Sequence, residues 1–368
     1  MPRAVTRGAL LLLAAAVVTS TTGPARAQPR GGDREEAAGV SLLFPTDNEA
    51  VLNFEPARFY MGLERHFGRE KEWTWEGGTY GYVREARRTP AGWRFTRFHE
   101  GVDIAPLYRD ARGEPLDEVR AVDEGRVVYA NASPGASDYG RYVVVEHVWE
   151  GSPFYTLYAH LGSVAVRSGE WVERGQRLGV LGYSGRGLDR ARAHLHFEIN
   201  LLLNEHFWAW RDGRRSRWSA THGRFHGVNL AGVSPVEILE RSHDARNFSI
   251  VDLLAHQQAD VTVHVPAGPP PDLLGRYPWM CRSCDGGPPP EWAPSWEVRL
   301  TRAGLPVRVE PMDRHVPTLR LAHVDGMVEA DYLASRILTR PGPGADLNAT
   351  GRALLALLFT RPGHVPNW

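Results

Sequence analysis

The sequence contains very little lysine or cysteine, and it has no long hydrophobic run. Lys71 is the only lysine, so a carrier protein that is modified on a lysine elsewhere in the chain is excluded. Two cysteines in 368 residues are too few for a small disulfide-stapled scaffold. The apolar stretches are far shorter than the roughly 20 residues of a membrane-spanning helix, so we expect no stable membrane insertion.

Net positive charge is also missing, because 43 basic residues balance 43 acidic ones. We therefore expect no nucleic-acid partner, because proteins that bind nucleic acids usually have a strongly basic surface. Hydrophobic residues make up 42% and charged residues 23% of the chain, which is typical of a folded globular protein. The length suits about two domains of roughly 100–200 residues each.

Residues 1–27 have the pattern of a secretory signal peptide. Arg3 and Arg7 form a basic start, residues 9–18 are apolar, and Ala25-Arg26-Ala27 is a small-x-small cleavage site. No cysteine follows the apolar stretch, so a lipoprotein anchor is not indicated. We predict an exported protein, periplasmic or extracellular, that is cleaved near Ala27.

The middle of the chain is typical of an antiparallel β-sheet. Residues 28–94 are expected to form a lead-in with short β segments that pack on the core. After them, β-branched and aromatic runs recur at short spacing, as at residues 126–130, 142–146 and 154–158. No amphipathic helix separates these runs, which disfavours a parallel sheet. The fold class is therefore mainly β.

The remainder of the chain differs in character from this β region. Residues 204–228, rich in tryptophan and arginine, interrupt the strand pattern as an insertion. Residues 242–368 are predicted to form a small α+β extension, to which the sequence assigns no role. Within it we expect a hairpin at 296–309 and helices near 327–340 and 350–359.

Two histidine motifs suit a metal site. In His194-Leu195-His196, the two-residue period of a strand sends both imidazoles to one face. His99 and Asp103 would share a face in the same way if extended, with Gly101 leaving room for a metal between them. Two histidines and one carboxylate are standard zinc ligands, and they leave a fourth position open for water.

His160 ends a further predicted strand, at residues 157–161. Beside a metal-bound water it would be a natural proton acceptor or oxyanion donor. Taken alone, a histidine at a strand end is more often structural than catalytic.

These motifs resemble the lysostaphin/LytM-type zinc metallopeptidases. The chain has His-x-Gly-x-Asp, Tyr-Ala-His-Leu, Gly-x-x-Val-x-x-Gly-Gln, Leu-Gly-Tyr-Ser-Gly and His-Leu-His-Phe-Glu-Ile in the order of that family, over about residues 95–203. The resemblance implies an antiparallel β catalytic domain, here residues 95–241, that cuts peptide bonds in the stems or cross-bridges of peptidoglycan.

Carried over by position, the resemblance implies one zinc ion held by His99, Asp103 and His196, with His160 and His194 as the catalytic histidines. The alternative is a non-catalytic LytM-type module that binds or activates another cell-wall hydrolase. Such modules are expected to lack metal ligands, whereas all five positions are filled here. A carrier-type barrel, suggested by residues 169–176, is excluded because the required lysine is missing.

Several other residues have competing interpretations. Cys281 and Cys284 favour a local disulfide over a metal or redox site. His147 is interpreted as structural, and Glu198 as a possible contact to a ligand imidazole. His222 and His226 are expected in a solvated loop. The arginines and tryptophans of the insertion suit either anionic glycan binding or a solvated loop; they are Arg211, Arg214, Arg215, Arg217, Trp208, Trp210 and Trp218.

The signal-peptide pattern makes a direct prediction. The mature protein should begin near Gln28, because cleavage follows the small residue Ala27. N-terminal sequencing of the protein isolated from its native host checks this, and an intact Met1 would contradict it.

Overall fold

The computed structural model describes residues 39–90, 92–213, 222–245, 247–326, 335–339 and 346–368. The predicted signal peptide and most of the polar lead-in lie outside these ranges. No helix within them is both long and apolar enough to span a membrane. Ala38–Trp368 forms one compact unit. The domain boundaries derived from the sequence within this unit therefore remain predictions.

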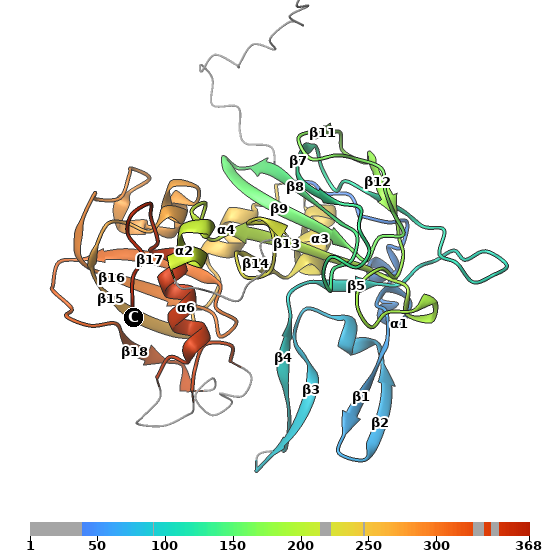
Figure 1. The fold of residues 1–368 in the computed structure, drawn as a ribbon, viewed down its shortest axis with the longest axis horizontal. Coiled ribbons are helices and arrows are strands. Elements are labelled where there is room, and N and C mark those ends of the chain that lie inside the picture. Colours follow the sequence, from blue (N-terminus) through green and yellow to red (C-terminus); the bar gives the residue numbers. More distant parts are fainter. Residues whose placement is uncertain (1–38, 91, 214–221, 246, 327–334, 340–345) are drawn as a thin grey trace, which may run out of the picture. The chain divides into compact units, whose positions relative to one another are not determined.

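An antiparallel sheet of seven strands carries the predicted β region (Figure 1). Its order is β11-β7-β8-β9-β13-β14, and β5 also pairs with β13. All eight residues of β13 are buried, because elements cover both faces of this strand. The strands are β5 (Val102–Ile104), β7 (Gly125–Asn131), β8 (Tyr142–Trp149), β9 (Ser152–Ala159), β11 (Trp171–Val172), β13 (Leu195–Leu202) and β14 (Leu230–Val233).

A second, three-stranded sheet has the order β10-β12-β6. Its strands are β6 (Glu118–Arg120), β10 (Ser163–Val164) and β12 (Arg177–Val180). A short 3-10 helix, η3 (Arg190–Arg192), comes just before β13. The prediction of a mainly β, antiparallel fold for this region is confirmed by this arrangement.

Two hairpins precede the large sheet, and Figure 1 shows them in blue and teal below it. They are β1 (Leu63–Phe67) with β2 (Glu70–Thr74), and β3 (Gly81–Thr89) with β4 (Gly92–His99). The short helices around them are η1 (Ala50–Asn53), α1 (Pro56–Phe59) and η2 (Trp75–Gly78). Phe44 and Phe59 of this region are buried in the main hydrophobic core.

The C-terminal extension is α+β, as predicted. Its four-stranded antiparallel sheet has the order β17-β16-β15-β18, with strands β15 (Val261–Gly268), β16 (Ala293–Leu300), β17 (Pro306–Met312) and β18 (Arg320–Val324). Its helices, with those that lead into it, are α2 (Phe207–Gly213), α3 (Pro235–Asp244), α4 (Ile250–Ala255), η5 (Asp272–Gly275), η6 (Pro278–Met280), η7 (Arg282–Cys284) and α6 (Ala349–Leu358).

The expectations for this extension have mixed outcomes. The hairpin is present as β16 and β17, the helix at 350–359 is present as α6, and Cys281 and Cys284 form a disulfide. The helix expected at 327–340 is wrong for residues 335–339, where Leu338 makes an isolated β-bridge to Leu347. Residues 327–334 and 340 lie outside the described ranges.

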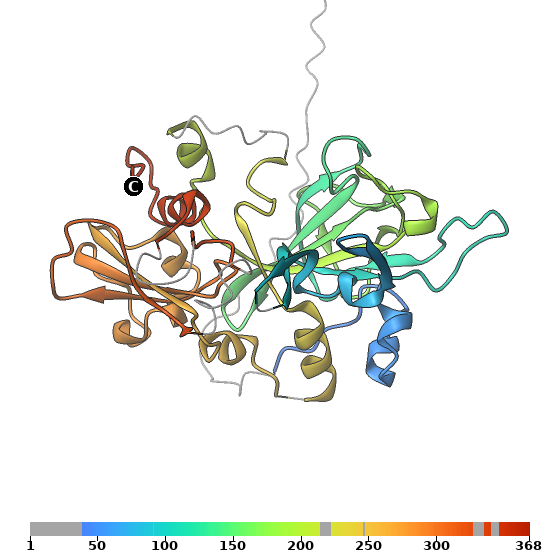
Figure 2. The ribbon, with the colours of Figure 1, turned by 90° about the horizontal axis from the view of Figure 1, so that it is seen from below.

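Buried polar contacts join this extension to the end of β13. The Asn204 side-chain amide donates to the carbonyl oxygens of Leu357 at 2.6 Å and Thr360 at 2.9 Å. The backbone N–H of Leu202 donates to the Tyr277 hydroxyl at 2.9 Å. Helices α2 and α6, far apart in the sequence, lie side by side in both views (Figure 1 and Figure 2). Residues of the extension and of the large sheet also belong to one hydrophobic core.

The segment that joins His99 to Asp103 is bent, which corrects the extended geometry expected from the sequence. Strand β4 ends at His99, residues 100–101 form a bend, and β5 begins at Val102. Gly101 lets the backbone of this bend pass close to β13, which is a different role from the expected one of leaving room for a metal ion. A Cβ there would lie 2.3 Å from the Phe197 carbonyl oxygen and 2.8 Å from Cγ of Glu198.

We predict that Gly101→Ala lowers the free energy of unfolding by about 1–3 kcal/mol, because β13 must shift to admit the methyl group. Chemical denaturation followed by circular dichroism measures this change. Gly135→Ala is the control, since a Cβ at Gly135 meets no atom within 4 Å. Equal stability of the two variants would contradict the close-approach argument.

Candidate metal centre

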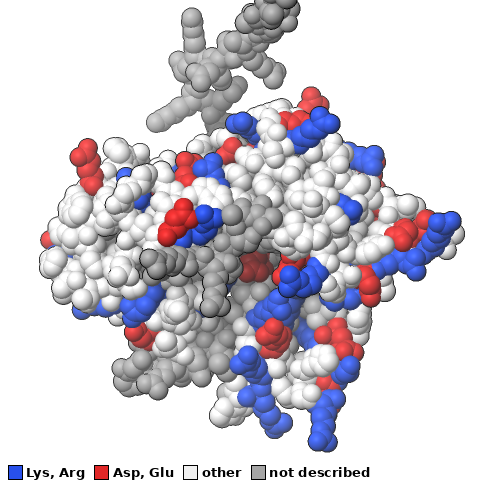
Figure 3. Space-filling view, viewed as in Figure 1, with Lys and Arg blue, Asp and Glu red and all other residues white. Residues whose placement is uncertain are grey.

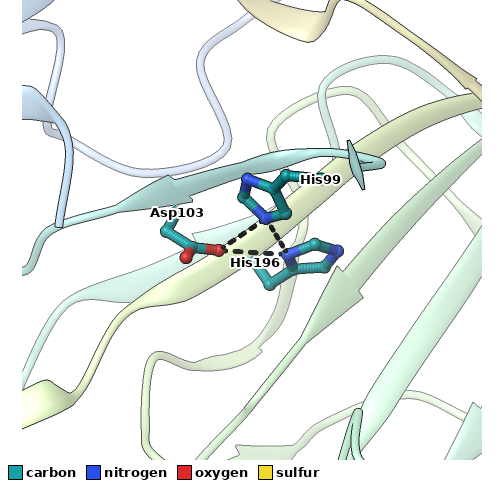
Figure 4. Close-up of side chains that lie close together, drawn as sticks. All are labelled: His99, Asp103 and His196. Atoms are coloured by element: carbon teal, nitrogen blue, oxygen red, sulfur yellow. Dashed lines mark hydrogen bonds and ion pairs between the residues drawn. The ribbon is translucent and has the colours of Figure 1, made fainter. Parts of the chain in front are cut away.

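Three side chains converge on one point beside the large sheet. His99, Asp103 and His196 form the one group of three metal-compatible side chains among the described residues (Figure 4). Asp103 Oδ1 lies 3.1 Å from His99 Nε2 and 3.1 Å from His196 Nδ1. The two ring nitrogens are also 3.1 Å apart. All three residues are buried.

Strand pairing explains this convergence of residues distant in sequence. In the antiparallel ladder between β5 and β13, Asp103 stands directly opposite His196. His99 ends β4, and the bend at residues 100–101 returns the chain to the same place. Directly opposed residues have side chains about 4.5–5.5 Å apart at Cβ, which suits two ligands of one ion.

The far nitrogen of each of the two histidines in this group is held by an acceptor. His99 Nδ1–H donates to the Thr79 carbonyl oxygen at 2.8 Å, and His196 Nε2–H donates to Glu198 Oε1 at 2.8 Å. A carbonyl or carboxylate only accepts, so the remaining nitrogens, His99 Nε2 and His196 Nδ1, face Asp103. This donor set and its outer hydrogen bonds fit a zinc ion with one open position.

Glu198 is a fully buried carboxylate with three partners. Besides His196, it accepts from the Tyr139 hydroxyl at 3.1 Å and the Asn200 amide at 2.9 Å. The strand alternation that pairs His194 with His196 also places Glu198 on this face, as the sequence suggested. Tyr139 comes from the loop before β8, where no sequence signal pointed to the site.

The two other histidines of the sequence motifs border the cluster. His194 Nε2 lies 3.4 Å from Asp103 Oδ1, and the His160 ring centroid lies 4.8 Å from that of His194. Each has its Nδ1–H fixed by a main-chain carbonyl, that of Arg192 at 2.7 Å and that of Ser184 at 2.9 Å. Both therefore present Nε2 to the site. All five sequence candidates meet here.

Burial and neighbouring charges shift the pKa values of this group. Burial lowers the pKa of His99 to about 4 and that of His160 well below its usual range. For Asp103, burial raises the pKa, but the charges of His99, His194 and Arg84 outweigh it and hold that pKa well below its usual range. Burial also opposes the charge on His196, yet hydrogen bonds to Asp103 and Glu198 raise its pKa to about 9.

Arg84 is part of the site, and no pattern in the sequence predicted this. It lies on β3, and its Nη2–H donates to His99 Nε2 at 3.1 Å and to Asp103 Oδ2. The chain contains 43 basic residues, so a single arginine in a hairpin carries no distinguishing signal. Only the pairing of β3 with β4, which leads into His99, brings it here.

Most of the other sequence candidates have structural partners. His147 contacts the Glu124 carbonyl at 2.7 Å and Thr156 Oγ1 at 2.8 Å, in agreement with a structural role. The expectation of solvated histidines at 222 and 226 is wrong, because aromatic rings bury both side chains. Trp210 is buried, and Arg211 covers the Trp208 ring; Arg214, Arg215, Arg217 and Trp218 lie outside the described residues.

Comparison with known proteins gives the same family as the motifs. The model of peptidase family M23 matches residues 97–206. Lipoprotein NlpD of Yersinia enterocolitica is 34% identical over 89 residues, 24% of this chain and 79% of the relative. The chain belongs to peptidase family M23. The matched residues include all five motif residues and every strand of the large sheet except β14.

Longer relatives match over part of their length. Peptidoglycan DD-endopeptidase ShyB of Vibrio cholerae is 33% identical over 170 residues, 45% of this chain and 35% of ShyB. Murein hydrolase activator NlpD of Escherichia coli is 32% identical over 127 residues, 34% of this chain and 28% of NlpD. The chain thus spans about a third of these relatives. The lysostaphin catalytic domain of Staphylococcus simulans aligns at 24% identity, over 33% of this chain and 75% of that domain, with a TM-score of 0.23.

The raised pKa of His196 predicts how metal binding depends on pH. Below about pH 9 a proton occupies Nδ1 and must leave before a metal binds, so affinity should rise about tenfold per pH unit up to that pH. Zinc affinity measured by chelator competition from pH 6 to 9 tests this. In Glu198→Gln the lost charge lowers the pKa, so the rise should end at lower pH. A wild-type plateau already at pH 7 would contradict the prediction.

Proposed function

We propose that this protein is an exported zinc metalloendopeptidase that hydrolyses peptide bonds in peptidoglycan stem peptides or cross-bridges. The observation that carries the proposal is the completeness of the site. Three donor atoms face one point, and two further histidines present Nε2 beside it. A metal site of purely structural use would need neither of those two histidines.

A groove lies next to the main-chain supports of His160 and His194, and none of the five site residues lines it. Its volume is about 690 Å³, and its lining includes Gly182 and Ser184. Gly182 forms a β-bridge with His194, and the Ser184 carbonyl holds His160. The groove therefore shares its wall with the supports of both histidines, and a peptide held in it would lie next to the site.

The residues divide the chemistry of amide hydrolysis as follows. A zinc ion bound by His99, Asp103 and His196 would polarise the scissile carbonyl and lower the pKa of an attacking water. His160, kept neutral by burial, can accept a proton at Nε2. His194 lies beside it, with the two ring centroids 4.8 Å apart, and when it carries a proton on Nε2 it can donate to the developing oxyanion or the leaving amine.

The alternative is a non-catalytic module that activates another cell-wall hydrolase. The similarity to NlpD, whose name describes a murein hydrolase activator, favours it. The filled ligand set and the two fixed histidines favour the enzyme. The two functions separate experimentally, because an activator releases no peptide from peptidoglycan when it is the only protein present.

We predict that His160→Ala and His194→Ala each keep zinc but lower turnover about a hundredfold or more, since each removes one proton-transfer group. His196→Ala should lose both zinc and activity. Purified peptidoglycan is digested with each variant, the new termini are identified by mass spectrometry, and zinc is measured on the same preparation.

His256→Ala is the matched control, because His256 is exposed and its ring bonds the Asp252 carbonyl. It should match the wild type in both measurements. Near-normal turnover of the His160 or His194 variant would remove that residue from the mechanism, and loss of zinc would make it a ligand. A wild type that binds zinc but releases no peptide would favour the activator.

A further inference from the structure

Arg84 bonds to two of the residues that would hold the proposed metal ion, His99 and Asp103. Its guanidinium Nη2 lies 3.1 Å from His99 Nε2 and forms an ion pair with Asp103 Oδ2. Its Nε–H donates to the Gly77 carbonyl oxygen at 3.0 Å, which holds the group over the cluster. The side chain is 25% exposed, so it fills the solvent side of a buried carboxylate.

Irregular hairpin geometry sets the position of this arginine. The register of β3 against β4 shifts between Tyr82 and Arg84, and the next residue, Glu85, has a positive φ of 56°. Such a φ is uncommon for a residue other than glycine and costs of order 1 kcal/mol. The shift interrupts the regular alternation of side chains at Arg84. Basic side chains gather over both hairpins in Figure 3, yet among the described residues Arg84 is the one arginine that hydrogen-bonds to the cluster.

The lone pairs of His99 decide what can bind there. Its Nδ1–H donates to Thr79, so the neutral ring has a single lone pair, on Nε2. The Arg84 N–H uses that lone pair, and a metal ion would require it. The two cannot be satisfied by the same nitrogen at the same time.

Charge adds to this exclusion. Asp103 is 5% exposed, and a buried carboxylate is costly unless a cation pairs with it. In the structure the Arg84 guanidinium supplies that cation. A divalent ion would replace it and would then repel a guanidinium that stayed within hydrogen-bond distance.

We propose that Arg84 is a built-in competitor for the metal site, which holds Asp103 in the metal-free protein and must leave His99 Nε2 when a metal ion binds. This inference rests on the proposed metal site. The β3–β4 hairpin would then influence how tightly the site binds metal, although β3 contributes no ligand. A change that draws Arg84 off the cluster would raise metal occupancy.

Zinc affinity of the full chain tests the proposal directly. Arg84→Met should bind zinc about tenfold or more tightly than the wild type, measured by competition with a chromophoric chelator at fixed pH. Arg84→Gln, which also removes the charge but keeps a polar end, serves as a second variant in case the first folds poorly. It should shift affinity in the same direction.

Arg97→Met is the matched control. Arg97 faces Arg84 across the same hairpin, is 64% exposed and pairs with Glu85, so its loss changes the net charge equally without touching the ligands. Its zinc affinity should stay within about twofold of the wild type.

Each outcome has one meaning. Unchanged or weaker zinc binding in both Arg84 variants would overturn the competitor role and indicate that Arg84 supports Asp103. An equal gain in Arg97→Met would also overturn it, because a general charge effect would then suffice. If the wild type and His196→Ala bind zinc equally, the proposed metal site itself fails, and the competitor role fails with it.

Discussion

The buried negative charge of Asp103 is the constraint on which the site depends. Its Oδ1 is shared by His99, His194 and His196, and its Oδ2 pairs with Arg84. These neighbours come from different parts of the chain, so the carboxylate is satisfied only when β3, β4, β5 and β13 are all in register. The bend before β5 and the tight contact at Gly101 serve that register. The site is therefore a product of sheet pairing rather than of any single loop.

Strand alternation made part of this site predictable from the sequence. It placed His194, His196 and Glu198 on one face, and the structure brings all three to the cluster. It failed for His99 and Asp103, which meet across a bend and not along one strand. Arg84 could not be found at all, because its approach depends on a register shift in β3 that leaves no mark in composition or spacing. The periodicity of a single strand predicts which side chains share a face, whereas pairing between distant strands decides which of these faces lie together.

The C-terminal extension shows the same limit on a larger scale. Its hairpin and last helix followed from residue patterns, but nothing in those patterns placed them against the peptidase sheet. Asn204 does so by binding main-chain carbonyls at the end of α6, about 150 residues away in sequence. A buried asparagine that reads as an ordinary loop residue is in fact the junction between the two regions. The extension consequently stabilises the end of β13, the strand that carries His196.

The chemical difference between the two histidines of the His-Leu-His motif comes from their hydrogen-bond partners. The residues are identical, lie on one strand face and approach the same carboxylate oxygen. The Arg192 carbonyl takes the Nδ1–H of His194 and leaves Nε2 facing the cluster, whereas Glu198 takes the Nε2–H of His196 and leaves Nδ1 facing it. Nδ1 is nearer the backbone, so His196 bonds close to its own strand while His194 extends past it. A ligand and a proton-transfer group can thus arise from one repeated residue, because the acceptors behind the two rings differ.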